Sequence, residues 1–126
     1  MRRFEIWQAI LPSVGERPVV IVSSDQDCKD LPFVSVVPLT TDLTTRQLSS
    51  HVLLSYPELE QPHRTLCEQV TTLDKACMHH LMGYVEDPYD RFAINRALAV
   101  HFNLTLTTYI YSEEESIYDV GFVKAV

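Results

Sequence analysis

Four consecutive β-branched residues, Val19-Val20-Ile21-Val22, constrain the fold of this chain more than any other stretch. Such a run favours extended backbone, and its lack of polar alternation is typical of a central strand buried on both faces. Before it, proline and glycine in the segment 11–15 indicate a change of chain direction. The sequence therefore predicts a β-sheet with residues 19–22 near its middle.

Other short β-rich runs recur before residue 86, and polar or proline-containing segments separate them. The expected strands are 4–10, 33–39, 51–55, 66–70 and 81–85, and the expected connections are 23–32, 40–50 and 56–64. Pro38 is expected to end its strand or to lie at a sheet edge, because proline cannot donate to a ladder. Many short strands joined by turns predict a β-barrel or a β-sandwich.

One helix is expected after these strands. Asp87 is a suitable N-cap, and Pro88 fits the first helical position. The predicted apolar face consists of Phe92, Ala93, Ile94, Ala97, Leu98 and Val100, with Arg91, Asn95 and Arg96 opposite. A stripe this broad predicts burial against the sheet. The β-forming residues of segment 105–111 are compatible with an additional strand in the tail.

Composition predicts one globular domain. The 126 residues are 46% hydrophobic and 21% charged, with 10 basic and 17 acidic residues and a net charge of −7. The tail holds four of these acids (Glu113, Glu114, Glu115 and Asp119) and one base (Lys124), so the remainder has 13 acids and 9 bases, a net charge of −4. We therefore divide the single domain 1–126 into a core of about 1–103 and an acidic C-terminal extension, 104–126. The net negative charge of the chain argues against nonspecific nucleic-acid binding, so any binding of RNA must depend on a few individually placed residues.

Cysteine and histidine positions indicate no metal and no cofactor. Cys28, Cys67 and Cys77 are odd in number and irregularly spaced, unlike a disulfide framework or a zinc site. His79 and His80 are adjacent, and adjacent residues on a strand point to opposite faces. Free thiols fit a reducing cytoplasm. We expect no signal peptide and no membrane span.

Three motifs follow one another along the chain. The first is Phe4-Glu5-Ile6-Trp7. The second is Arg17-Pro18-Val19-Val20-Ile21-Val22-Ser23, followed after a polar connection by Val37-Pro38-Leu39-Thr40-Thr41. The third is Leu66-Cys67-Glu68-Gln69-Val70-Thr71-Thr72-Leu73-Asp74-Lys75. In this order and spacing, over about residues 4–103, the chain resembles the MazF/PemK/Kid toxins of type II toxin–antitoxin systems.

The resemblance implies a small SH3-like β-barrel with a C-terminal helix, assembled as a two-fold homodimer. It also implies a cytoplasmic, metal-independent endoribonuclease that cuts single-stranded RNA and is bound by a cognate antitoxin protein. In this family the 2′-hydroxyl of the RNA attacks the phosphate, giving a 2′,3′-cyclic phosphate and a 5′-hydroxyl. Such a site must accept the 2′-proton, stabilise the charge on the phosphorane and protonate the leaving oxygen.

Three catalytic residues follow from the resemblance. Arg17 matches the catalytic arginine, whose planar guanidinium grips two phosphate oxygens; alternatively, it is a solvated charge that opens a strand. Thr40 matches the catalytic-site threonine, or its hydroxyl satisfies its own backbone at a strand end. Glu68 is a candidate general base, or a structural residue that pairs with backbone or with Arg17. Leu66 stands where some relatives carry an arginine, so an acid partner for Glu68 is missing.

The resemblance also places four residues in RNA binding: Glu5, Glu16, Thr41 and Gln69. Glu5 is equally compatible with a surface carboxylate, and Gln69 with holding the fold or contacting a base edge. The loop before Arg17 is shorter than in the family, which leaves substrate positioning open. Phe4 replaces the usual glycine.

Two other functions remain open. CcdB-type toxins share the barrel but bind DNA gyrase without catalysis; Val22-Ser23-Ser24-Asp25 and Ala93-Ile94-Asn95 resemble that branch. Their C-terminal Trp-Gly-Ile is replaced here by Lys124-Ala125-Val126. A catalytically inactive relative that binds only an antitoxin is the second alternative, favoured by Leu66 and the short loop.

The acidic tail is either a solvated run or a segment that competes with RNA for the groove.

Overall fold

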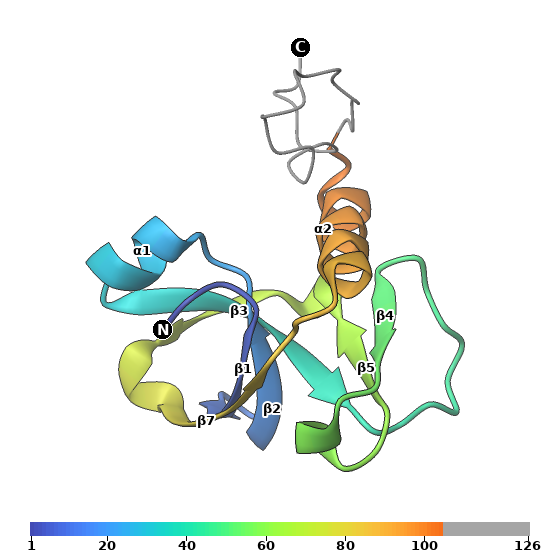
Figure 1. Cartoon of the computed structure of the whole chain (residues 1–126), viewed down its shortest axis with the longest axis horizontal. Helices are drawn as coiled ribbons and strands as arrows, with labels where there is room; N and C mark the ends of the chain where they lie inside the picture. Colours follow the sequence, from blue (N-terminus) through green and yellow to red (C-terminus); the bar gives the residue numbers. More distant parts are fainter. Residues whose placement is uncertain (105–126) are drawn as a thin grey trace.

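The computed structural model (Figure 1) describes residues 1–104. Residues 105–126 of the extension, which include the predicted additional strand and the acidic run, lie outside the described residues. The elements in chain order are β1 Glu5–Leu11, β2 Gly15–Ile21, α1 Asp25–Asp30, β3 Phe33–Thr40, β4 His51–Leu54, η1 Pro57–Leu59, β5 His63–Leu66, η2 Cys67–Gln69, β6 Thr71–Asp74, η3 Lys75–Cys77, β7 Met78–Tyr84 and α2 Pro88–Phe102. Three of these, η1 to η3, are single 3₁₀ turns.

The strands form one antiparallel sheet in the order β4-β5-β3-β2-β1-β7, with β6 also paired to β3. Strand β3 explains the curl of the sheet because it has three neighbours. Its first half pairs with β6, its middle pairs with β2 through Val19 opposite Pro38, and its end pairs with β5 through Thr40 opposite Arg64. The sheet curls without closing, since β4 and β7 are the ends of this order. The predicted fold class, mainly β with a C-terminal helix and barrel-like, is confirmed.

Strand β2 is buried on both faces, as predicted from its β-branched run. Val20, and Val22 directly after the strand, pack into the core beneath α2, whereas Val19 and Ile21 pack into a second core on the other face of the sheet. We call these the helix-side core and the inner core. The inner core consists of Ala9, Leu11, Val19, Ile21, Cys28, Val34, Val36, Leu73 and Met78. Period-two alternation therefore assigns each strand residue to one of the two faces of the sheet.

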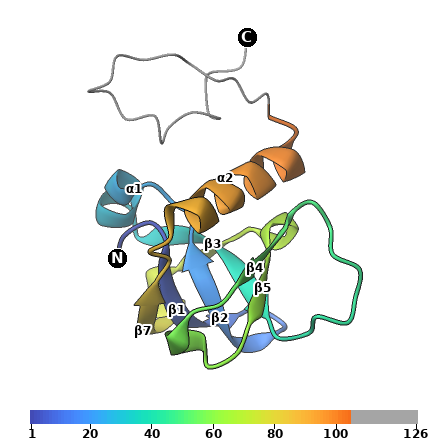
Figure 2. The same ribbon diagram turned by 45° about the vertical axis from the view of Figure 1, so that its right-hand side comes forward.

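Helix α2 crosses one face of the sheet (Figure 2) and begins as predicted. The side chain of Asp87 accepts a hydrogen bond from the Tyr89 amide, and Pro88 is the first helical residue. The predicted apolar face is partly wrong: Phe92 is 42% exposed and Val100 48% exposed. The helix packs against β4 and η2 along a narrow strip, and its buried positions are Ile94, Ala97, Leu98 and Ala99.

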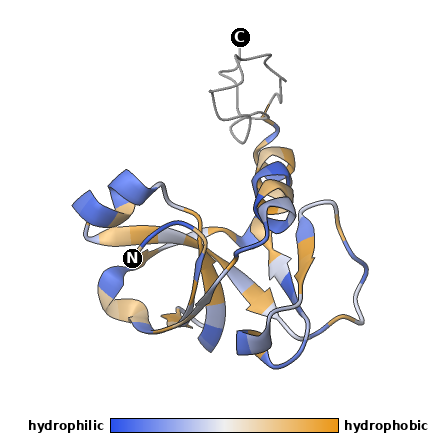
Figure 3. Cartoon of the chain, viewed as in Figure 1, coloured by the Kyte–Doolittle hydropathy of each residue, from blue (hydrophilic) through white to orange (hydrophobic). Residues whose placement is uncertain are grey.

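The structure differs from the sequence prediction in segments 23–32 and 66–70. Segment 23–32 contains α1, whose N-cap Ser24 accepts from the Asp27 amide. This helix is hydrophilic over most of its surface (Figure 3), and Cys28 is its one buried residue. Its sequence therefore has no apolar periodicity from which a helix could be predicted. Segment 66–70 was predicted as a strand, but the strand there is β5, which ends at Leu66, and η2 follows it. Strand β5 escapes notice because His63, Arg64 and Thr65 are polar residues that the fold buries.

Pro38 neither ends its strand nor lies at a sheet edge. It is the last β3 residue paired with β2, and β3 continues two residues further to pair with β5. The missing N–H of proline thus falls where one ladder stops and another begins.

Candidate active site

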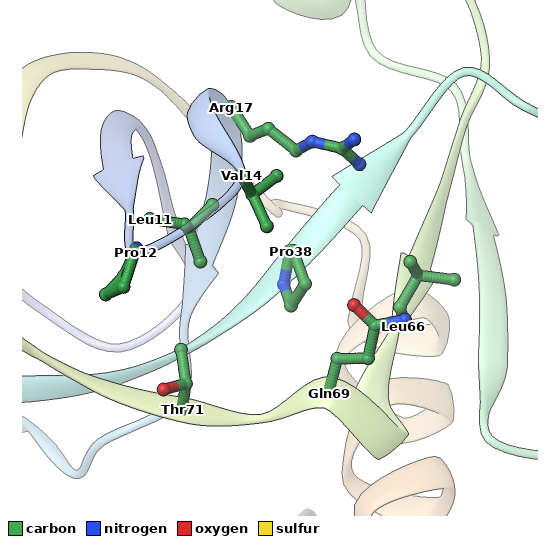
Figure 4. A pocket seen from close by; sticks show the side chains of 8 residues that line it. All are labelled: Leu11, Pro12, Val14, Arg17, Pro38, Leu66, Gln69 and Thr71. Atoms are coloured by element: carbon green, nitrogen blue, oxygen red, sulfur yellow. The ribbon is translucent and has the colours of Figure 1, made fainter.

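A pocket of about 380 Å³ opens where the β1–β2 hairpin, β3 and η2 meet (Figure 4). It is lined by Leu11, Pro12, Val14, Arg17, Pro38, Leu66, Gln69 and Thr71. Five of these side chains are apolar, and the remaining three are a guanidinium, an amide and a hydroxyl. An apolar concave surface with a few polar groups is the usual composition of a ligand site.

The β1–β2 hairpin forms one wall of the pocket. Leu11 pairs with Gly15, and the Val14 amide donates to the Leu11 carbonyl at 3.2 Å. Gly15 has a φ of 93°, a conformation that glycine adopts without a side-chain clash. The short loop thereby places Val14, which is 53% exposed, directly against the pocket.

Arg17 carries the positive charge of the pocket. It pairs with Ala9, an inner-core residue, so its side chain lies on the inner-core face of β2. Figure 4 shows the guanidinium extending from β2 toward the end of β3. Within residues 1–104, the guanidinium makes neither a hydrogen bond nor an ion pair, so its donors are available to an anion. Phosphate is the anion that a guanidinium matches best in geometry.

Thr40 lies at the neighbouring strand end. Val19 pairs with Pro38, and continuing this antiparallel register by two residues places Arg17 opposite Thr40. Strand alternation also puts Thr40 on the same face as the pocket residue Pro38. The Asp42 amide donates to Thr40 Oγ1 at 3.1 Å. This contact occupies a lone pair of the hydroxyl oxygen and leaves the hydroxyl hydrogen free to donate.

The opposite wall of the pocket comes from the third sequence motif. In Figure 4 the Gln69 side chain extends from η2 toward Pro38, beside Leu66. Thr71 completes this wall from β6. Thr41 is exposed and is the first residue of the loop that follows β3.

The Glu68 side chain does not line the pocket. Its Oε1 accepts from Ser50 Oγ at 3.0 Å, and its Oε2 lies 3.0 Å from His51 Nε2. The Leu48 amide donates to His51 Nδ1, so the proton of a neutral imidazole resides on Nε2 and points at Glu68. Burial raises the pKa of Glu68, but the hydrogen bonds from His51, its own backbone and Ser50 outweigh burial, and the pKa is lowered overall.

This network predicts a pH-dependent contribution of Glu68 to stability. Because the folded-state pKa is lowered, the contribution is fully present above the unfolded-state pKa, near ~4.3, and is lost as the pH falls through the folded-state value. We expect Glu68→Gln to lower the free energy of unfolding at pH 7 by about 1–3 kcal/mol, with the deficit shrinking toward pH 3. Urea denaturation across this range measures it, with the exposed Glu86→Gln as control. A deficit independent of pH would contradict the assignment.

Glu5 and Glu16 are not brought to the pocket. Glu5 lies at the far end of β1 from the hairpin, where its Oε1 accepts from Trp7 Nε1 at 2.9 Å. Glu16 precedes Arg17 and therefore faces the other side of β2, where its Oε1 lies 3.2 Å from His79 Nδ1. The predicted proximity to RNA came from motif matching, which gives neither the distance of Glu5 from the pocket along β1 nor the face of β2 that Glu16 occupies.

Sequence reasoning missed the pocket walls and one buried cation. Leu11, Val14 and Thr71 carry no chemical signal in the sequence, and Arg64 was placed in a loop.

Among residues 1–104 no helix is long and apolar enough to cross a membrane. The same residues contain no cluster of three or more His, Cys, Asp or Glu side chains arranged for a metal ion.

Residues 2–102 match a family model described as PemK-like, MazF-like toxin of type II toxin–antitoxin system. The chain belongs to this family. The match spans the three motifs and every element from β1 to α2, and it confirms the resemblance drawn from the sequence.

Relatives of this toxin-family chain are found among characterised proteins and solved structures. It is 30% identical over 112 residues to "Endoribonuclease MazF" of Staphylococcus saprophyticus, covering 82% of this chain and 92% of the relative. A Mycobacterium tuberculosis toxin, MazF-mt6, is 26% identical, with a TM-score of 0.67 over 79% of this chain and 97% of the other. A mycobacterial endoribonuclease in complex with its cognate antitoxin shares the fold, with a TM-score of 0.73, 24% identity, and coverage of 85% and 99%.

Proposed function

We propose that this MazF-like toxin is a metal-independent endoribonuclease that cuts single-stranded RNA at the Arg17 pocket. The observation that carries the proposal is the guanidinium of Arg17, which has no hydrogen-bond or ion-pair partner among residues 1–104 and lines a pocket at the strand end opposite Thr40. The curated relative named as an endoribonuclease supports the reaction class. The proposed place of action is the cytoplasm, where RNA is translated.

In the proposed reaction the 2′-oxygen of a ribose forms a bond to the adjacent phosphorus, and the bond from phosphorus to the 5′-oxygen breaks. The 2′-oxygen passes its proton to water, the leaving 5′-oxygen takes one from water, and the products are a 2′,3′-cyclic phosphate and a 5′-hydroxyl. The pentacoordinate intermediate carries additional negative charge on its equatorial oxygens. Arg17 stabilises that charge through two parallel N–H donors, and Thr40 adds its hydroxyl. Glu68, whose carboxylate is held by Ser50 and His51, supports η2 in this proposal rather than moving a proton.

The remaining walls suit a nucleobase beside the scissile phosphate. Leu11, Val14 and Leu66 offer apolar contact to a base face, and the Gln69 amide offers both a donor and an acceptor to a base edge. A base that is stacked and paired in a duplex cannot enter such a pocket, whereas an unpaired base can be splayed into it. This geometry supports a preference for single-stranded RNA.

Two protein partners belong to the proposal. Solved structures of relatives include complexes with antitoxins, and we propose that a cognate antitoxin segment covers this pocket and blocks RNA. A disordered segment that folds on binding suits an open groove of this kind. We also propose a two-fold homodimer, the commonest symmetric assembly.

The proposal is tested by incubating the purified chain with mixed-sequence RNA in EDTA, as single strands and as the annealed duplex. We expect the single strands to be cut and the duplex to survive. A DNA gyrase supercoiling assay runs in parallel. Intact single strands would contradict the proposal: with supercoiling arrested, they would support the gyrase-binding alternative, and with supercoiling unaffected, the inactive relative.

A further inference from the structure

Arg64 is a buried arginine outside the pocket lining. It lies opposite Thr40 in the β3–β5 ladder, so the two side chains share a face of the sheet, and 5% of its surface is exposed. Its guanidinium donates to the loop that follows Thr40: Nη1 to the Thr45 carbonyl at 3.0 Å and to Thr45 Oγ1 at 3.2 Å, and Nη2 to the Leu43 carbonyl at 3.4 Å. Arg64 therefore fixes the carbonyl groups on both sides of Thr44.

Folding alone does not account for an arginine at this position. Arg64 Nε is buried and has no hydrogen-bond partner among the described residues. Burying a charge and leaving one N–H unpaired are both unfavourable, and an apolar side chain of similar volume avoids both costs. The hydrogen bonds of Arg64 to the loop are thus the distinctive consequence of its presence.

The loop transmits this constraint back to Thr40. Asp42 Oδ1 accepts from the Thr44 amide at 3.0 Å and from Thr44 Oγ1 at 2.6 Å, which closes a tight turn. The amide of the same Asp42 donates to Thr40 Oγ1. Contacts therefore run from Arg64 through residues 43–45 to Asp42 and from there to the Thr40 hydroxyl. Figure 2 shows this segment as the long connection between β3 and β4.

We propose that Arg64 is a positioning residue that orients the Thr40 hydroxyl for RNA cleavage. The inference rests on the proposed function, because it directs that hydroxyl at the scissile phosphate. Arg64 holds the turn, the turn holds the Asp42 N–H against Thr40 Oγ1, and the hydroxyl hydrogen is left to donate to a phosphate oxygen. Arg64 is buried and acts through Thr40 without touching RNA.

The structural half of this proposal is tested without any nuclease assay. Amide hydrogen exchange, followed by NMR, reports the protection of the Asp42 and Thr44 amides. We expect Arg64→Met to accelerate their exchange by about tenfold or more while the β-ladder amides Val20 and Val37 stay protected. The matched control Arg46→Met removes an equal charge from an exposed position of the same loop and is expected to leave Asp42 protected. Unchanged protection of Asp42 in Arg64→Met would overturn the proposal.

The catalytic half is tested by a double-mutant cycle on kcat with Thr40→Val. A displaced donor costs up to about 10²-fold, so we expect Arg64→Met to lower kcat by roughly 10- to 100-fold when Thr40 is present. In the Thr40→Val background the same change is expected to cost no more than about twofold, because the group it orients is already gone. Equal losses in both backgrounds would show that Arg64 acts independently of Thr40 and would overturn the proposal.

A conservative variant keeps the tests decisive if Arg64→Met fails to fold. Arg64→Lys retains the charge but provides a compact ammonium that cannot bridge the Leu43 and Thr45 carbonyls as a fork does. It is expected to show the same loosening of Asp42 and the same non-additivity with Thr40→Val, and the absence of both would again overturn the proposal. If the wild-type chain cleaves no RNA, the proposed function fails and the catalytic role with it, whereas the exchange data still decide whether Arg64 holds the loop.

Discussion

Replacing Arg17 with alanine is expected to lower kcat for RNA cleavage by about 10²–10³-fold, the usual cost of removing one preorganised donor to a developing oxyanion. The physical reason is that Arg17 is the cation among the residues that line the pocket, where its guanidinium can bind the phosphate. Because this side chain makes no hydrogen bond or ion pair to the rest of the described chain, its loss is expected to leave the melting temperature nearly unchanged. Single-turnover cleavage and thermal denaturation measure the two quantities.

Two variants control this experiment. Arg17→Lys keeps the charge but loses the planar fork, so an intermediate rate is expected. Arg46→Ala removes a charge from the exposed loop, and its effect is expected on KM and on salt dependence rather than on kcat. Cleavage at the wild-type rate by folded Arg17→Ala would remove Arg17 from the mechanism.

The largest stability effect is expected at Ile94. This residue of α2 is 0% exposed and packs in the helix-side core with Leu39, Val52 and Leu54. Ile94→Ala deletes buried methyl and methylene groups and leaves a cavity between helix and sheet, so the free energy of unfolding should fall by about 2–5 kcal/mol. Urea denaturation at neutral pH measures the change.

Val100→Ala is the matched control for Ile94. It deletes β-branched methyl groups from the same helix at a position that is 48% exposed. We expect a change within about 0.5 kcal/mol, as for other surface substitutions. If the two variants are equally destabilised, then α2 does not pack on the sheet through Ile94, and the described helix-side core is wrong.

Strong local signals made parts of this fold predictable. The run Val19–Val22 predicted a doubly buried strand, and Asp87-Pro88 predicted where α2 starts. Helix α1 was not predicted because it has a single buried residue, Cys28, and one apolar position gives no helical periodicity in the sequence. Strand β5 escaped because Arg64 and Thr65 are polar residues whose burial depends on partners distant in sequence.

The candidate site divides in the same way. Arg17, Thr40 and Gln69 were expected from family motifs, and the structure places the first and last in one pocket and Thr40 at the adjoining strand end. Glu5 and Glu16 were expected to contact RNA too, yet Glu5 lies at the far end of β1 from the pocket, and side-chain alternation turns Glu16 to the other face of β2. The roles of His51 and Arg64 depend on three-dimensional contacts that no sequence spacing reveals.

The most direct test of the account is the chemistry of the cut ends. Mixed-sequence single-stranded RNA is incubated with the purified chain in EDTA, and the fragments are analysed by mass spectrometry. Attack by the 2′-oxygen at the Arg17 pocket predicts fragments that end in a 2′,3′-cyclic phosphate and begin with a 5′-hydroxyl, and predicts that a 2′-deoxy sugar at the cut position blocks cleavage. Fragments with 3′-hydroxyl and 5′-phosphate ends, or cleavage that proceeds through the 2′-deoxy position, would contradict it.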